Sequence, residues 1–175
     1  MLSRLRRQLV LLAGAVLIGG CAVIRPPPKS DASEPRAWSG RLAVQAQAPD
    51  ASADAWTFSA EFDVQGSAQA GELQLFSPLG TTLAEVSWQA NAARLRSRGQ
   101  VRDFADLDAL MSDLLGVSLP SQALFAWLKG QWVKPTGWDV DLSQHAIGRI
   151  SASKFSEPKA RLTLVFQAHP NAGQP

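Results

Sequence analysis

The chain has 175 residues, of which 46% are hydrophobic and 18% charged, a composition that suits one globular domain with an apolar core. The formal net charge is +2, but three of the 17 basic residues lie close to the N-terminus, and the rest of the chain holds 14 basic residues against 15 acidic ones. A near-neutral domain without a run of lysine and arginine lacks the electrostatic footprint of nucleic-acid binding. With a single cysteine, the chain can form no internal disulfide.

The N-terminal residues have the three parts of an export signal. Arg4, Arg6 and Arg7 precede the apolar block 9–18, and the block ends in the small-residue sequence IGGC at 18–21. The block is too short to be a permanent membrane span. We therefore expect a lipoprotein signal peptide over 1–20 and a lipid anchor on Cys21. A plain secretory signal with a chance cysteine, or an uncleaved membrane anchor, is the alternative interpretation.

The segment 21–37 contains four prolines and scattered charges, and it offers almost nothing apolar to bury, so it is expected to be a tether. From Trp38 the hydrophobic period becomes two, most clearly over 56–65, where apolar and polar residues alternate. Shorter alternating runs follow around 42–46, 73–75, 84–88, 93–95, 138–142, 147–153 and 162–166. Tight turns between them predict an antiparallel meander that curls into a barrel or half-barrel.

Between residues 104 and 129 the period changes to that of a helix. Leu107, Leu110 and Leu114 lie on one helical face, Asp106 is a candidate N-cap, and Gly116 is a candidate stop. A second short helix is expected after Pro120, with Ser121 as its cap and its end at Gly130. Strands followed by two amphipathic helices and further strands predict an α+β fold, in which the helices cover one open face of the sheet.

The alternation places Trp56, Phe58, Phe62 and Trp88 on the concave side of the predicted sheet. A curled sheet roofed by helices encloses either a packed core or a ligand cavity, and the pattern of residues is compatible with both.

Catalytic motifs are weak in this sequence. A triad or metal cluster would depend on His145, because His169 falls in the segment 169–175, which is expected to be a disordered tail. Ser151 and Lys154 match the SxxK pattern of penicillin-binding enzymes, but the partner motifs SDN and KTG are missing. We expect no enzyme, no catalytic residues, no metal and no cofactor. A non-enzymatic structural or assembly lipoprotein that acts through its surface is one alternative, and an enzyme that uses Ser151 and Lys154 is another.

Three segments resemble the outer-membrane lipoprotein receptor family LolB. They are GELQLFSPLG at 71–80 with the strand after it, LLGVSLP at 114–120 leading into LFAWLKG at 124–130, and the pair Gly137-Trp138. The resemblance covers about 38–166. It implies a barrel domain over 38–168, an unclosed antiparallel β-barrel (half-barrel) with a small helical lid over an apolar cavity. It departs from the family in its short second half and in the lack of a closing tryptophan.

The resemblance also implies a function. Such a protein takes the acyl chains of a lipoprotein from a soluble periplasmic carrier (LolA-like) and delivers the lipoprotein into outer-membrane lipid. It is a monomer anchored in the outer membrane, facing the periplasm, and Ala22 after the anchor cysteine agrees with that destination because an aspartate there marks inner-membrane retention in enterobacterial-type lipoproteins. The turn Pro78, Leu79 and Gly80 would insert into the membrane. The residues assigned to the acyl-chain cavity are Trp56, Phe58, Phe62, Leu73, Leu75, Val86, Trp88, Leu110, Leu114, Leu124 and Trp127.

Overall fold

A computed structural model describes residues 37–47 and 56–169. The expected signal peptide, Cys21 and nearly all of the expected tether lie outside the described residues, as do residues 170–175. The strands are β1 (Ala37–Ala46), β2 (Trp56–Gly66), β3 (Gly71–Phe76), β4 (Thr82–Gln89), β5 (Ala92–Ser97), β6 (Gln100–Phe104), β7 (Trp138–Asp141), β8 (Arg149–Lys154) and β9 (Ala160–His169). The helices are α1 (Leu107–Leu115) and α2 (Ser121–Leu128), and a short 3-10 helix η1 spans His145–Ile147.

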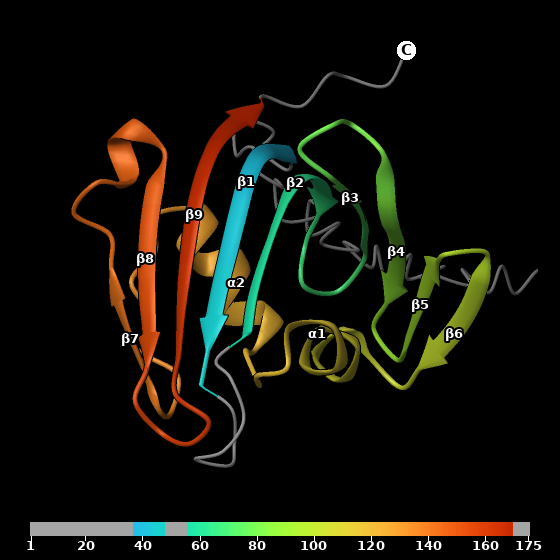
Figure 1. The fold of residues 1–175 in the computed structure, drawn as a ribbon. Helices are drawn as coiled ribbons and strands as arrows, with labels where there is room; N and C mark the ends of the chain where they lie inside the picture. The colour runs from blue at the N-terminus through green and yellow to red at the C-terminus, as the bar shows by residue number, and fades with distance from the viewer. Residues whose placement is uncertain (1–36, 48–55, 170–175) are drawn as a thin grey trace, which may run out of the picture. The chain divides into compact units, whose positions relative to one another are not determined.

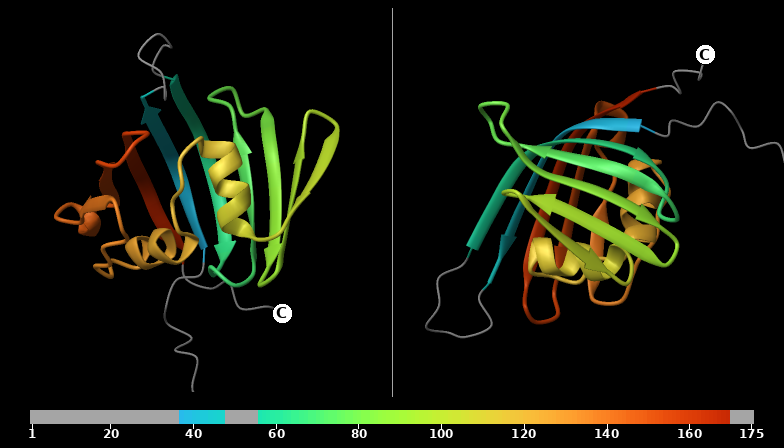
Figure 2. Two further views of the ribbon diagram at one scale, coloured as in Figure 1. Left: turned by 90° about the horizontal axis from the view of Figure 1, so that it is seen from below. Right: turned by 90° about the vertical axis from the view of Figure 1, so that its right-hand side faces the viewer.

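All the described strands belong to one 9-stranded antiparallel sheet with the order β6-β5-β4-β3-β2-β1-β9-β8-β7 (Figure 1). The first strand, β1, pairs with β2 on one side and with β9 on the other. Strands β6 and β7 are the two edges, and within the described part of the chain no ladder joins them, so the sheet stays open. Both helices lie across the same face of the sheet (Figure 2). This arrangement confirms the predicted α+β fold with an unclosed antiparallel barrel.

The alternation of the sequence sets the two faces of the sheet. In β2, Phe62 and Val64 are buried beneath the helices, while Asp63 between them is exposed. In β3, Leu75 is buried and its neighbour Gln74 is exposed. Burying a large apolar side chain stabilises the fold by about 1.5 to 3 kcal/mol, so a slip of one residue in register would expose a whole row of such side chains. Within the described residues, no helix has both the length and the apolar character needed to cross a bilayer.

Helix α1 begins and ends as predicted. The side chain of Asp106 accepts a hydrogen bond from the Ala109 N–H at 2.8 Å, and Gly116 ends the helix with a left-handed φ of 63°. The prediction that Ser121 caps α2 was wrong. Pro120 is the cap residue, and Ser121 is already helical and donates its N–H to the Asp108 side chain at 2.7 Å. A carboxylate from α1 therefore satisfies the first turn of α2.

Two further elements differ from the sequence prediction. Strand β6 was not predicted, because all its residues except the half-buried Phe104 are exposed and it pairs only with β5. Ile147, expected in a strand, lies in η1, and β8 starts after Gly148. A Cβ on Gly148 would lie 2.0 Å from the carbonyl oxygen of Phe166, so this close approach requires glycine. Strand β9 runs through His169, one residue into the expected tail.

Replacing Gly116 with alanine is expected to lower the free energy of unfolding by about 2 kcal/mol. Part of this loss is the left-handed backbone of residue 116, and part is the new Cβ, which would lie 2.9 Å from the Trp56 ring. Gly99→Ala is the matched control, because φ at Gly99 is 76° and a Cβ there would meet nothing within 4 Å. It should lose only about 1 kcal/mol in urea denaturation. Equal losses in both variants would show that the Trp56 contact adds nothing.

Candidate functional site

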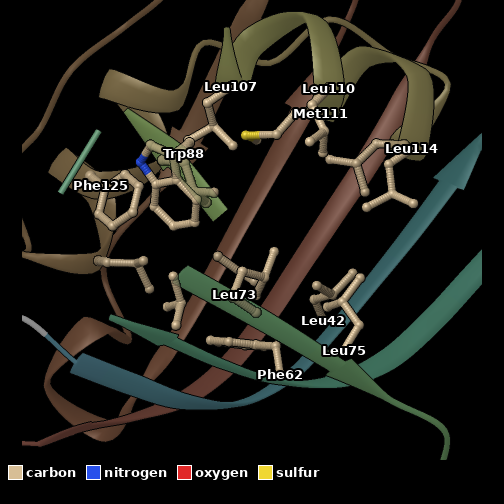
Figure 3. A pocket seen from close by; sticks show the side chains of 15 residues that line it. Leu42, Phe62, Leu73, Leu75, Trp88, Leu107, Leu110, Met111, Leu114 and Phe125 are labelled. Atoms are coloured by element: carbon tan, nitrogen blue, oxygen red, sulfur yellow. The ribbon is translucent and has the colours of Figure 1, made fainter. Parts of the chain in front are cut away.

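A pocket lies between the helices and the concave face of the sheet, and every side chain that lines it is apolar. Figure 3 shows Leu107, Leu110, Met111 and Leu114 of α1 facing Leu42, Phe62, Leu73 and Leu75 of the sheet. The complete lining is Leu42, Phe62, Val64, Leu73, Leu75, Trp88, Leu107, Leu110, Met111, Leu114, Leu115, Leu124, Phe125, Leu128 and Leu164. Such a surface offers a ligand no hydrogen bond and no charge, so it suits a hydrocarbon rather than a polar substrate.

The free space in the pocket is small in this structure, about 70 Å³. An engineered apolar cavity that binds one benzene measures about 150 Å³, so a space of less than half that volume cannot hold a fatty-acyl chain. Four lining residues are only partly buried: Leu42, Leu73, Leu114 and Leu124. They mark the parts of the lining that solvent reaches.

Of the residues assigned to a cavity from the sequence, the structure brings together Phe62, Leu73, Leu75, Trp88, Leu110, Leu114 and Leu124 around this pocket. The other four are not part of its lining. Trp56 and Phe58 are half-buried against the core, and Val86 is a buried core residue of β4. Trp127 is fully buried, with its ring edge-on to Trp138 and its indole N–H donating to the Val133 carbonyl at 2.8 Å.

Sequence reasoning did not assign eight of the lining residues to the cavity: Leu42, Val64, Leu107, Met111, Leu115, Phe125, Leu128 and Leu164. Their signals were present in the sequence. Leu107, Met111 and Leu115 continue the i, i+4 stripe of α1, and Leu42, Val64 and Leu164 lie on the inward face of their strands. Phe125 joins the pocket to the core, because its ring lies 6.0 Å from the rings of both Trp38 and Trp88.

The two helices differ in the polar contacts that hold them. Three hydrogen bonds hold the region of α2: Trp127 to the Val133 carbonyl, Trp138 to the Ser118 carbonyl at 3.0 Å, and the His145 ring with the Leu128 carbonyl at 3.1 Å. For α1 the structure gives one ion pair to the sheet, between Arg102 and Asp113 at 2.7 Å. Both partners are partly exposed, and such a pair contributes at most about 1 kcal/mol. Helix α1 also holds the first turn of α2 through Asp108, and its buried face packs on the sheet.

The possible catalytic pair of Ser151 and Lys154 does not form. The residues are three apart on β8, which places their side chains on opposite faces of the sheet. The Lys154 ammonium is buried and donates to the carbonyls of Ser156, Glu157 and Pro158 at 2.8, 3.1 and 3.2 Å. It holds the loop between β8 and β9. In the described ranges, no group of three or more His, Cys, Asp or Glu side chains could hold a metal ion.

The β3–β4 turn presents an apolar side chain to solvent. Leu79 is 93% exposed, the most exposed large apolar residue of the described chain. The turn itself is firmly built, because the Ser77 N–H donates to the Thr81 carbonyl and the Gly80 N–H donates to the Ser77 carbonyl, both at 2.8 Å. The Ser77 hydroxyl also accepts from the N–H groups of Leu79 and Thr81. These hydrogen bonds fix the turn in a conformation that points the Leu79 side chain into solvent.

Comparison with known proteins agrees with this architecture. The family model "Outer membrane lipoprotein LolB" matches residues 35–163. The outer-membrane lipoprotein LolB of Thiobacillus denitrificans is 32% identical over 132 residues, which cover 73% of this chain and 67% of that protein. The protein of the same name from Ralstonia nicotianae is 36% identical over 142 residues, covering 74% of this chain and 64% of that protein.

A third relative, the outer-membrane lipoprotein LolB of Cupriavidus metallidurans, is 33% identical over 185 aligned positions, which cover all of this chain and 85% of that protein. The chain thus spans about two thirds of the first two relatives and more of the third. The family match includes strands β1 to β8, the start of β9, both helices and the exposed Leu79 turn. The resemblance noted in the sequence is confirmed, and the chain belongs to the outer-membrane lipoprotein LolB family.

Proposed function

We propose that this protein is anchored in the outer membrane through Cys21, faces the periplasm, and accepts lipoproteins from a soluble periplasmic carrier (LolA-like). It takes their acyl chains into the pocket between α1 and the sheet and then releases them into outer-membrane lipid. The observation that carries the proposal is the wholly apolar lining of that pocket. The process needs no covalent chemistry, nucleotide or cofactor.

The energetics require a path that avoids water. Exposing hydrocarbon costs about 0.8 kcal/mol per methylene, so three long acyl chains would cost on the order of 30 kcal/mol to pass through solvent. A transfer from one apolar cavity to another avoids most of that cost. The flexible side chain of Met111 and the leucines around it can repack around chains of varied length.

The pocket must enlarge before it can hold an acyl chain, since its volume is only about 70 Å³. We infer that α1 moves away from the sheet while α2 stays in place. Moving α1 breaks the exposed Arg102–Asp113 pair and the Asp108–Ser121 hydrogen bond, whereas displacing α2 would also break the partly buried hydrogen bonds of Trp127 and His145. The incoming chains replace the apolar contacts that α1 loses, so the open state is stabilised by its ligand.

Release occurs at the membrane surface, where Leu79 enters the lipid. Burying one leucine is worth about 1.5 to 3 kcal/mol, which is too little for an anchor but enough to bias a reversible local insertion. The ordered turn around Ser77 keeps the leucine outward before contact, so little entropy is lost on insertion.

Depletion of the protein from its native cell tests the proposal. Lipoproteins should accumulate on the soluble carrier in the periplasm, and re-expression of the chain should clear them. Re-expression of the Leu79→Glu chain, with its pocket intact, should restore acceptance from the carrier but not delivery. If lipoproteins reach the outer membrane normally during depletion, the proposal is wrong. That result would favour the alternative of an assembly lipoprotein that acts through its surface.

A further inference from the structure

Two neighbouring hairpins point their turns in the same direction. Strands β3 and β5 flank β4 and run in the same direction. The β3–β4 turn with Leu79 and the β5–β6 turn with Arg98 therefore lie at the same end of the strands. Both panels of Figure 2 show the two turns pointing the same way. The β3–β4 turn carries the exposed leucine, and the β5–β6 turn carries an exposed arginine.

The β5–β6 turn is a tight one in which the side chain of Arg98 is unexpected. Ser97 pairs with Gln100, and φ is 52° at Arg98 and 76° at Gly99. Two-residue hairpin turns with both φ values positive favour Asn-Gly or Asp-Gly, because asparagine and aspartate tolerate the left-handed conformation. Arg98 is the only non-glycine residue with positive φ in the described ranges. Turn geometry therefore does not account for the arginine, and a strained residue of this kind invites a functional explanation.

Arg98 also differs from the other arginines on this hairpin, because each of them is paired with an acidic residue. Arg94 pairs with Asp103 at 2.6 Å, Arg96 with Glu85 at 3.4 Å, and Arg102 with Asp113 at 2.7 Å. Arg98 forms no ion pair with any residue that the structure describes. Neither turn, 77–82 or 97–101, contains an acidic residue. This end of the strands is therefore apolar at one turn and cationic at the other.

The register of the strands shows how far Leu79 and Arg98 each project along the strand direction. Glu85 pairs with Arg96, and the Ser97 hydroxyl donates to the Leu83 carbonyl at 2.7 Å, so Arg98 lies about level with Leu83. Leu79 projects about three residues further, which is at most about 10 Å at 3.3 Å per residue. The headgroup region of one leaflet is roughly 5 to 8 Å thick. With Leu79 at the hydrocarbon boundary, the long side chain of Arg98 reaches the level of the phosphates.

We propose that Arg98 binds the phosphate of a membrane phospholipid when Leu79 enters the bilayer. A guanidinium donates two parallel hydrogen bonds to a phosphate, which matches this ligand better than a lysine would. The contact fixes the depth and orientation of the β3–β4 turn at the moment of release. This inference rests on the insertion of Leu79 in the proposed function and adds the lipid phosphate as a ligand.

The test uses the full chain, held by its own anchor in vesicles of phosphatidylethanolamine and phosphatidylglycerol at 3:1. A photo-reactive benzoylphenylalanine replaces Leu79, and the yield of phospholipid adduct is measured. Arg98→Asn should lower that yield about fivefold, the effect of one arginine near an anionic surface. High salt should lower the yield of the Arg98 chain toward the same level and leave the Arg98→Asn chain nearly unchanged.

Folding cannot explain such a loss, because asparagine suits the turn position better than arginine does. Urea denaturation should give the Arg98→Asn chain an equal or higher midpoint. Arg96→Gln is the matched control: it removes a charge from the same hairpin at an arginine that is already paired with Glu85, and the adduct yield should stay unchanged. Equal yields for the Arg98 and Arg98→Asn chains would overturn this inference alone. An absence of phospholipid adduct even with Arg98 in place would overturn the insertion of residue 79, and this inference with it.

Discussion

Replacing Leu79 with glutamate is expected to slow the transfer of lipoprotein into liposomes at least tenfold, while acceptance from the carrier stays within about twofold. Removing the leucine forfeits about 1.5 to 3 kcal/mol of insertion energy, and about 1.4 kcal/mol corresponds to a factor of ten. A carboxylate at the same position adds the penalty of placing a charge in hydrocarbon. The side chain is 93% exposed and the turn is held by Ser77 and backbone groups, so the fold should be unaffected.

Ile147→Glu is the matched control for this change. Ile147 is 77% exposed in η1, which precedes β8 at the end of the strands opposite the Leu79 turn, so the variant replaces an exposed apolar residue by the same charge at a distance from both turns. Transfer by the Ile147→Glu protein should match that of the parent chain. If a folded Leu79→Glu protein also transfers at the parent rate, then the insertion mechanism is wrong. If acceptance falls instead of release, Leu79 belongs to the surface that meets the carrier.

Much of the fold could be predicted because one physical signal, the period of burial, was strong along most of the chain. Strand β2 alternates without a break over its length, and the stripe of α1 carries both its cap and its stop. Strand β6 was not predicted, because it lies at an edge of the sheet and buries almost nothing, so its sequence has no hydrophobic period. Periodicity detects a strand only when one of its faces is covered.

The candidate site was harder to predict, because periodicity identifies the face of an element but not what that face meets. Trp56 and Phe58 share the alternating run with Phe62, yet they lie toward one end of β2, away from the pocket. Helix α2 is buried on almost every side, so its sequence could not tell which residues look into the pocket. Phe125 lines the pocket, whereas Trp127 packs against Trp138 of β7. These contacts depend on how far the sheet curls, a property of the whole fold.

Photo-crosslinking on β3 tests most directly the claim that the pocket receives acyl chains. Leu73 lines the pocket and is half-buried, so a benzoylphenylalanine can replace it with little strain, while the neighbouring Gln74 is exposed on the opposite face. Each probe-bearing protein is mixed with a complex of the soluble carrier and a lipoprotein and is then irradiated. The position of the adduct on the lipoprotein is mapped by mass spectrometry.

The account predicts that the probe at Leu73 is joined to the acylated N-terminus of the lipoprotein and that the probe at Gln74 gives only background. Equal adducts from both positions, or none from Leu73 while lipoprotein still passes from the carrier to this protein, would contradict the account, because the chains would then travel by a route other than the pocket.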